Sequence, residues 1–213
     1  MEFIPEKIDD YAGEHTAAES ALLSDLSRET HLKIMTPRML SGHIQGRFLS
    51  MITHMLKPKF VLEIGTYTGY SALCMAEGLH PQGKIITIDN NEELKDILDK
   101  HLLASEFSNQ IEFKLGAALD IIPTLENEID LVFIDADKPN YSNYFDAVID
   151  KMRPGGFILA DNVLWSGKVA EEIKPNDKST VAIDAFNKKV HDDPRVENVL
   201  IPIRDGIMAL RKL

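Results

Sequence analysis

The 213-residue chain has a single cysteine, Cys74, and no long apolar run. One cysteine excludes a disulfide within the chain and any zinc site built on several cysteines. Cys74 lies in the apolar segment 72–76 and is predicted to be a buried small side chain. No window approaches the ~20 apolar residues of a membrane-spanning helix. The first six residues lack a basic region followed by an apolar stretch, so we expect no signal peptide and a cytoplasmic protein.

Positive charge is also scarce. Lysine and arginine total 23 against 34 aspartates and glutamates, a net charge of −11, which repels a phosphate backbone and disfavours a large nucleic-acid interface. Repeats and low-complexity segments are absent, and 44% hydrophobic with 27% charged residues is typical of a globular protein. The length predicts one domain, 1–213, with a helical extension over 1–58 and a core over 59–213.

The first 58 residues have the patterns of helices. Thr16 and Glu19 have capping-box spacing before the apolar run that starts at Ala21. Thr36 and Pro37 predict the start of a longer helix, with apolar residues in a four-residue step up to Met55, that ends at Lys57–Pro58. From Phe60 on, short strands alternate with helices. The predicted strands are 60–64, 84–89, 110–114, 129–135, 156–161, 196–202 and 207–211, and the predicted helices are 70–79, 91–104, 118–125, 140–152 and 178–190.

This alternation predicts an α/β fold with a doubly wound, mostly parallel sheet and helices on both faces. Continuous apolar strands such as 131–134 indicate burial on both faces of the sheet. The last two strands are joined only by residues 204–206, too few for a parallel crossover, so they form an antiparallel hairpin. We therefore predict a Rossmann-like, seven-stranded sheet with an antiparallel last strand.

A glycine-containing turn follows the first strand. Gly65 and Gly69 allow the backbone to approach a ligand, and Asp89, about 20 residues later at the end of the second strand, is placed to accept hydrogen bonds from ribose hydroxyls. The dinucleotide fingerprint G-x-G-x-x-G is missing, and Glu63 would repel a pyrophosphate. The set favours an adenosine ligand with a cationic or neutral group, such as S-adenosylmethionine. The alternative is a tight strand-to-helix turn without a ligand.

Hard oxygen ligands end two other predicted strands. Asp135 ends one strand, and Asp161 and Asn162 end the next. Two carboxylates and an amide suit Mg²⁺ or another hard divalent cation, and the carboxyl ends of parallel strands are where such folds bind ligands. The alternative is that each aspartate caps the helix that follows it.

Two residues near these acids are candidates for substrate contact. Lys138 lies three residues beyond Asp135, where a partly desolvated lysine beside a metal can act as a general base, although a lone lysine is usually a solvated charge. Trp165, the only tryptophan, can pack on an aromatic substrate ring or belong to the core. The seven histidines show no ligand spacing, and we expect them at the surface or at helix caps.

At these residues the chain resembles the metal-dependent, S-adenosylmethionine-dependent O-methyltransferases of the catechol and caffeoyl-CoA type. The resemblance covers nearly the whole length. It is carried by LEIGTYTGYS at 62–71, FIDADKPNY at 133–141, and the segment from Pro154-Gly155-Gly156 to DNVLW at 161–165.

The resemblance implies the class I S-adenosylmethionine-dependent methyltransferase fold and a role for each candidate. Asp135, Asp161 and Asn162 would hold Mg²⁺, Lys138 would deprotonate the accepting hydroxyl, and Trp165 would pack on the acceptor ring. Relatives of bacterial and plant type are commonly homodimers, so a homodimer is implied. The residues that match cofactor-contacting positions are Met35, Thr36, Glu63, Gly65, Tyr67, Ser71, Asp89, Ala118, Asp135 and Asp137, with Asp89 on the ribose.

We therefore expect a Mg²⁺-dependent enzyme that transfers a methyl group from S-adenosylmethionine to a hydroxyl of a catechol-like small molecule. Methylation of a hydroxylated uridine in tRNA by the same fold is an alternative, which the net charge disfavours. A nicotinamide dehydrogenase is disfavoured by the missing dinucleotide fingerprint. A catalytically silent S-adenosylmethionine-binding protein is disfavoured because all four residues of the metal and base set are present.

Overall fold

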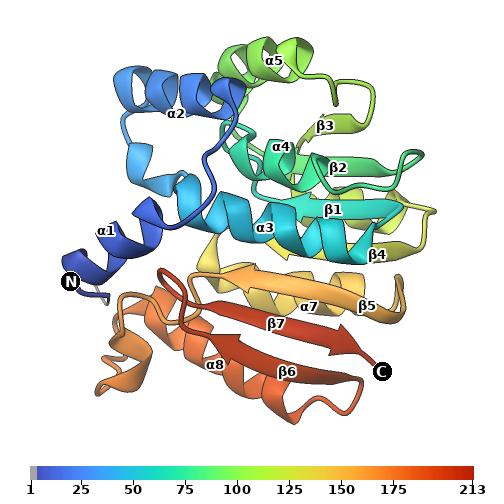
Figure 1. Ribbon diagram of the computed structural model, residues 1–213. Helices are drawn as coiled ribbons and strands as arrows, with labels where there is room; N and C mark the ends of the chain where they lie inside the picture. The colour runs from blue at the N-terminus through green and yellow to red at the C-terminus, as the bar shows by residue number, and fades with distance from the viewer. Residues whose placement is uncertain (1–3) are drawn as a thin grey trace. The chain divides into compact units, whose positions relative to one another are not determined.

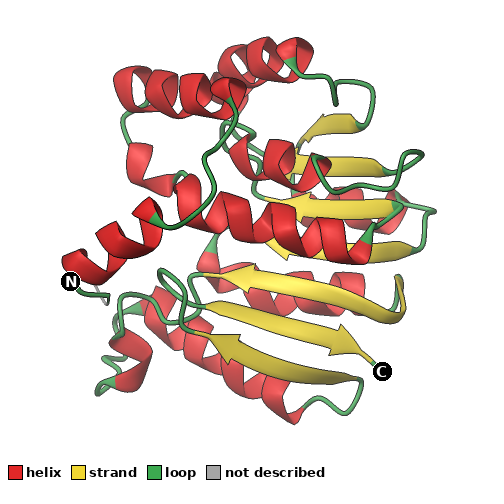
Figure 2. Cartoon of the chain, in the orientation of Figure 1, coloured by secondary structure: helices red, strands yellow, loops and turns green. Residues whose placement is uncertain are grey.

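The computed structural model describes residues 4–213 (Figures 1 and 2). Its strands form a seven-stranded sheet in the order β3-β2-β1-β4-β5-β7-β6. The strands are β1 (Phe60–Ile64), β2 (Lys84–Asp89), β3 (Ile111–Leu115), β4 (Ile129–Ile134), β5 (Met152–Asp161), β6 (Val196–Ile201) and β7 (Ile207–Lys212). The α-helices are α1 (Glu6–Glu14), α2 (Ala21–Lys33), α3 (Gly42–Leu56), α4 (Tyr70–Ala76), α5 (Lys95–Ala104), α6 (Ala118–Ile121), α7 (Tyr141–Ile149) and α8 (Lys178–Asp192).

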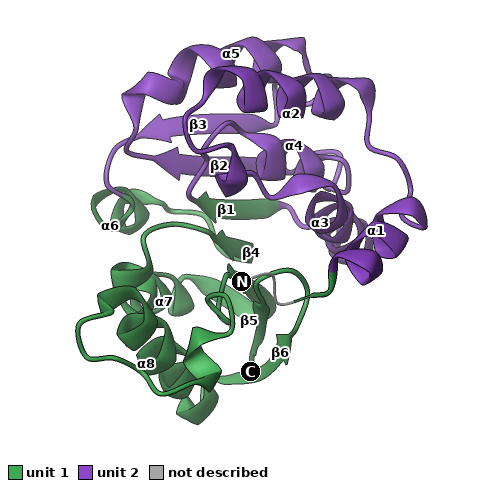
Figure 3. Ribbon diagram, turned by 90° about the vertical axis from the view of Figure 1, so that its left-hand side faces the viewer, with its two compact units in different colours: residues 1–5, 60–64, 118–213 green, residues 6–59, 65–117 purple. Residues whose placement is uncertain are grey.

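The chain divides into two compact units, each assembled from separate stretches of sequence (Figure 3). Unit 1 contains Phe60–Ile64 and Ala118–Leu213, and unit 2 contains Glu6–Lys59 and Gly65–Ala117. One boundary lies a residue from the predicted start of the core, but unit 2 also includes a long stretch assigned to that core. The single-domain organisation stays a prediction.

Unit 1 carries the parallel strands that end in the predicted metal ligands. β1 pairs with β4, and β4 with β5, both parallel; β7 pairs antiparallel with β5 and with β6, which confirms the predicted hairpin. α7 and α8 pack against each other and lie behind these strands in the view of Figure 1. β4 is almost wholly buried, as its continuous apolar sequence predicts.

Unit 2 carries the glycine turn and the N-terminal helices. β2 and β3 pair parallel, with Ile85 opposite Ile111. α3 packs closely on α4, and two glycines allow this approach: a Cβ on Gly46 would lie 2.7 Å from the Tyr70 ring, and one on Gly78 only 2.2 Å from the His54 backbone nitrogen. Cys74 on α4 is buried, as predicted, and burial raises the pKa of its thiol to about 12, so it stays protonated.

Several helix boundaries differ from the sequence-based predictions. The predicted capping box is wrong: the Thr16 hydroxyl donates to the Ala12 carbonyl (2.6 Å), and Ser20 caps α2 instead by accepting the Leu23 N–H (3.3 Å). Thr36 precedes a short 3₁₀ turn, η1 (Pro37–Met39), rather than the long helix, which begins at Gly42.

Other predicted helices are shorter or divided. α4 ends at Ala76, α7 spans only Tyr141–Ile149, and the helix predicted from residue 91 begins as a 3₁₀ turn, η2 (Glu92–Leu94), before α5. Short polar segments allow both 3₁₀ and α hydrogen bonding, so their sequence does not define the boundary. Within residues 4–213, no helix has the length and apolar character needed to cross a membrane.

The contact between Gly78 and α3 generates a stability prediction. Gly78→Ala should lower the free energy of unfolding by about 1–3 kcal/mol or more, because the added methyl group meets rigid backbone rather than a flexible side chain. Gly13→Ala is the matched control, since nothing lies within 4 Å of a Cβ there; as a helical alanine it should stabilise by about 0.5–1 kcal/mol. Urea denaturation of both variants checks this, and equal stabilities would contradict it.

Candidate active site

Unit 1 brings the predicted metal ligands together at the ends of two paired strands. Ile134 pairs with Ala160 in the parallel β4–β5 register, so Asp135 and Asp161 are the next residues along two neighbouring strands. Asn162 follows with a left-handed backbone (φ 57°), a conformation that asparagine adopts more readily than most residues. The Asp161 Oδ1 atom accepts the Asn162 backbone N–H at 2.7 Å, and Asp161 is only 2% exposed.

Lys138 lies at the centre of this cluster. It begins the 3₁₀ turn η4 (Lys138–Asn140), and its side chain is buried. Nζ donates to the Tyr141 hydroxyl at 2.6 Å, to Asn162 Oδ1 at 2.8 Å and to Asp135 Oδ1 at 3.3 Å. These three contacts use all three hydrogens of an ammonium group.

The donor set fits a hard divalent cation. The ammonium of Lys138 already lies within reach of oxygens from Asp135 and Asn162, two of the three predicted ligands, so these oxygens converge closely enough to share one positive charge. Carboxylate and amide oxygens are the ligands that Mg²⁺ takes in proteins. The part of the chain that the structure describes has no group of three or more His, Cys, Asp or Glu side chains that could hold a metal ion. The predicted site is not such a group, because its third ligand, Asn162, is an amide.

Tyr141 belongs to the same cluster and was assigned no role from the sequence. It is fully buried, and its hydroxyl donates to the Asp161 carbonyl at 2.9 Å while accepting from Lys138. Its ring meets Phe186 edge to face at 5.4 Å. Burial raises the pKa of the Tyr141 phenol well above its usual value, so the group stays neutral. Its spacing of three residues from Lys138 was the available signal.

The remaining candidates of unit 1 lie around this cluster. The Trp165 ring is half-buried, and its centroid lies 5.7 Å from Lys138 Nζ. Asp137 is exposed and accepts hydrogen bonds from Asn140 Nδ2 at 2.6 Å and from the Tyr144 hydroxyl. Glu63, opposite Phe133 in the β1–β4 register, is fully buried, and Ala118 begins α6.

In unit 2, the predicted cofactor loop at residues 65–69 is hydrogen-bonded to Asp89. Gly65 and Gly69 have positive φ angles of 101° and 87°, as the close turn predicts, and Tyr67 also lies in the left-handed region at 50°. The Asp89 carboxylate accepts the backbone N–H of Tyr67 at 2.8 Å and that of Asn91 at 3.0 Å. These contacts orient Asp89 and still leave acceptor capacity on both oxygens for ribose hydroxyls.

The same loop is hydrogen-bonded to the segment that carries Met35 and Thr36. The Tyr67 hydroxyl donates to the Thr36 carbonyl at 3.0 Å, and the buried Thr30 hydroxyl on α2 donates to that of Thr68 at 3.2 Å. Met35 is 98% exposed. Ser71 is buried in the first turn of α4.

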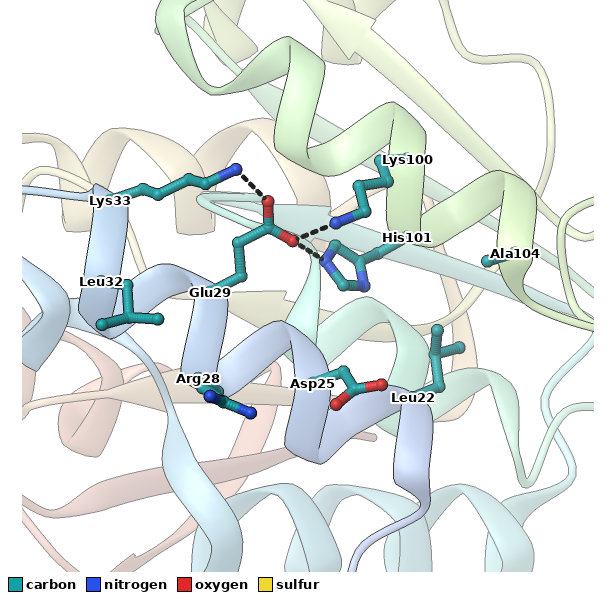
Figure 4. A pocket seen from close by; sticks show the side chains of 9 residues that line it. All are labelled: Leu22, Asp25, Arg28, Glu29, Leu32, Lys33, Lys100, His101 and Ala104. Atoms are coloured by element: carbon teal, nitrogen blue, oxygen red, sulfur yellow. Dashed lines mark hydrogen bonds and ion pairs between the residues drawn. The ribbon is translucent and has the colours of Figure 1, made fainter.

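A groove of about 420 Å³ in unit 2 contains an ion-pair cluster but none of the predicted site residues (Figure 4). Glu29 on α2 accepts from Lys100 at 2.5 Å, Lys33 at 2.6 Å and His101 at 2.8 Å. His101 is buried on α5, which corrects the prediction that all histidines lie at the surface or at caps. Hydrogen bonds from these partners, Lys100 foremost, lower the pKa of Glu29 to about 2. The groove lies between α2 and α5, and the ion pairs of Glu29 with Lys100 and His101 connect the two helices.

Comparison with known proteins identifies relatives of the chain. The family model described as O-methyltransferase matches residues 13–213. A caffeoyl-CoA O-methyltransferase of Mesembryanthemum crystallinum is 36% identical over 186 residues, which cover 82% of this chain and 73% of that protein.

Solved structures agree with this match. The O-methyltransferase TomG of Streptomyces achromogenes, in complex with S-adenosylmethionine, has a TM-score of 0.89 at 27% identity and covers 97% of this chain and 96% of its own. The O-methyltransferase of Bacillus cereus, in complex with S-adenosylhomocysteine, has a TM-score of 0.88 at 27% identity, covering 97% of both chains.

The Glu29 cluster predicts a pH-dependent stability difference. Because the pKa of Glu29 falls from 4.5 to about 2 on folding, its ion pairs contribute fully above the unfolded value and are lost as the pH falls through the folded value. The unfolding free energies of the wild type and Glu29→Gln should therefore differ near neutral pH and converge toward pH 2. Asp25→Asn removes a negative charge from the same groove and is the control. A gap that stays constant with pH would contradict the role of Glu29.

Proposed function

The chain belongs to the O-methyltransferase family, as an S-adenosylmethionine-dependent enzyme of the caffeoyl-CoA type, and we propose that its acceptor is a catechol-like phenol held by a divalent cation, preferably Mg²⁺. One observation carries the proposal. Lys138 Nζ lies within hydrogen-bond distance of oxygens from two strand ends, in a buried cluster that also contains Asp161. Such a cluster provides a proton-accepting group and a cation site side by side.

Asp135, Asp161 and Asn162 are the residues that would hold the cation. When bound, it supplies a positive charge that lowers the pKa of an acceptor hydroxyl and favours an acceptor with two adjacent oxygens. The third residue of this set is held in its left-handed conformation with its N–H on the neighbouring Asp161 carboxylate, which fixes the side chains relative to each other.

Lys138 is the proposed general base. As an ammonium it donates to three acceptors, whereas a neutral amine has two hydrogens and one lone pair, so one of the three contacts gives way to the acceptor hydroxyl. The hydroxyl proton moves to Nζ. When bound, S-adenosylmethionine would supply the methyl group: the acceptor oxygen would form the O–C bond as the C–S bond of the sulfonium breaks, with S-adenosylhomocysteine as the leaving group. The Tyr141 hydroxyl keeps Nζ in place throughout.

The proposed cofactor contacts are the residues that the resemblance implies. Asp89 would accept from the ribose hydroxyls, and the loop at Tyr67 would lie against the cofactor because its backbone is already fastened to that carboxylate. The Thr36 carbonyl is tied to Tyr67, so the segment at 35–36 is connected to the same loop. The other proposed contacts are Met35, Glu63, Gly65, Ser71, Ala118, Asp135 and Asp137.

Trp165 is the proposed contact for the acceptor ring, since its own ring lies beside the Lys138 ammonium. A homodimer and a cytoplasmic location are likewise part of the proposal and rest on the resemblance to relatives of bacterial and plant type. The alternative acceptor, a hydroxylated uridine in tRNA, is disfavoured by the net charge of −11.

The proposed cation site predicts strict metal dependence. Asp161→Asn keeps the size of the side chain but removes one ligand charge, so methyl transfer to catechol should fall by orders of magnitude while S-adenosylmethionine binding, measured by calorimetry, stays near the wild-type value. Asp150→Asn, at a carboxylate that is 83% exposed, is the control.

Assays on catechol and on bulk tRNA, each with and without EDTA, separate the two acceptors. Full activity after exhaustive chelation would rule out the cation.

The proposed base predicts an acceptor-dependent defect. Lys138→Met keeps the length of the side chain but cannot take a proton, so kcat on catechol should fall ~10²–10⁴-fold. A nitrocatechol is more acidic and already ionised near neutral pH, and it should depend less on the lysine. Steady-state rates on both acceptors check this. An equal loss on both would show that Lys138 positions the acceptor without accepting its proton.

A further inference from the structure

The loop that carries Trp165 has an unusual backbone. Trp165 and Ser166 are consecutive non-glycine residues in the left-handed region, with φ angles of 49° and 56°, and Gly167 continues at 79°. L-residues adopt this conformation at a cost, and it persists only where the surroundings hold it in place. Something outside the loop must therefore fix this segment.

The turn between β6 and β7 provides that restraint. The Leu164 N–H donates to the Asp205 backbone carbonyl at 2.9 Å, and the Ser166 N–H donates to the Asp205 carboxylate. One residue thus binds both neighbours of Trp165, one through its main chain and the other through its side chain. The Val163 N–H adds a third bond, to the Gly206 carbonyl at 3.1 Å.

The turn also packs directly on the loop. Gly206 is buried with a φ of 86°, and a Cβ there would lie 2.5 Å from Leu164 Cγ, so only glycine fits. A side chain of α8 also contacts the loop: Asn187 Nδ2 donates to the Val163 carbonyl at 2.9 Å. The carboxylate of Asp205 is half-buried, and burial raises its pKa. A partly desolvated carboxylate facing a backbone N–H makes a strong, directional hydrogen bond.

The geometry points to Asp205 as a positioning residue that holds the Trp165 ring beside the Lys138 ammonium, where the acceptor ring would pack. This inference rests on the proposed function, because it uses the acceptor contact assigned there to Trp165. In this inference Asp205 acts through the backbone on both sides of the tryptophan, at Leu164 and Ser166. Its loss should therefore affect acceptor binding and leave cofactor binding alone.

The single tryptophan gives a direct readout. In Asp205→Ala, acrylamide quenching of the Trp165 emission should increase because the ring is released, and the acceptor KM should rise about tenfold, as expected for loss of one charge-assisted hydrogen bond. The kcat and the S-adenosylmethionine Kd should change little. Asp205→Asn keeps an oxygen acceptor for the Ser166 N–H and should restore most of both properties.

Asp193→Ala is the matched control, because Asp193 also accepts a backbone N–H, that of Arg195 at 2.9 Å, in the turn before β6. It should leave the Trp165 emission and the acceptor KM unchanged. Wild-type quenching and KM in Asp205→Ala, or the same changes in Asp193→Ala, would overturn the inference.

Trp165→Leu separates this inference from the proposed function. If Trp165→Leu leaves the acceptor KM unchanged, the acceptor contact in the proposed function is wrong, and Asp205 has no positioning role for the acceptor even where quenching increases. If Trp165→Leu raises KM while Asp205→Ala does not, the acceptor contact stands and the role of Asp205 alone is refuted.

Discussion

The parallel register between β4 and β5 is the constraint on which the candidate site depends. Because Ile134 lies opposite Ala160, the next residue on each strand is an aspartate, and both carboxylates emerge at the same edge of the sheet. Two adjacent carboxylates repel each other unless a cation lies near them. Lys138 provides one such charge through its contact with Asp135, and the 3₁₀ turn that begins at Lys138 brings Nζ to that point. A register shifted by one residue would separate the pair and turn one side chain to the other face.

The two loops most relevant to ligand binding are fastened in the same way. In unit 2, the left-handed Tyr67 donates its N–H to the Asp89 carboxylate. In unit 1, the left-handed Ser166 donates its N–H to the Asp205 carboxylate. In each case a side-chain oxygen from the end of one strand or turn stabilises a backbone conformation in a loop distant in sequence. Both aspartates would thereby prepare a binding loop before any ligand arrives, which lowers the ordering cost of binding.

The fold could be predicted largely from the sequence because its strands are short apolar runs that are bounded by polar and turn-forming residues. β1 and β2 match their predicted bounds, and the hairpin followed from the shortness of the segment between the last two strands. The first residues of the helices were harder to predict from the sequence. Thr16 had the residue types of a capping box, yet its hydroxyl closes the preceding helix, because a threonine oxygen can bond in either direction along the chain.

The sequence by itself determined which chemical groups lie at the strand ends: an acid and glycines at the end of β1, an aspartate at the end of β2, and carboxylates with an amide at the ends of β4 and β5. Local spacing and apolar patterning suffice for this, since residues at strand ends occupy predictable places. Only the tertiary structure decided which side chains meet. Lys138 joins Asn162, 24 residues away, Asp205 joins Ser166, 39 residues away, and His101 is buried against Glu29, 72 residues away. Contacts at such separations depend on how helices and turns pack after the sheet forms, and no local sequence pattern encodes that packing.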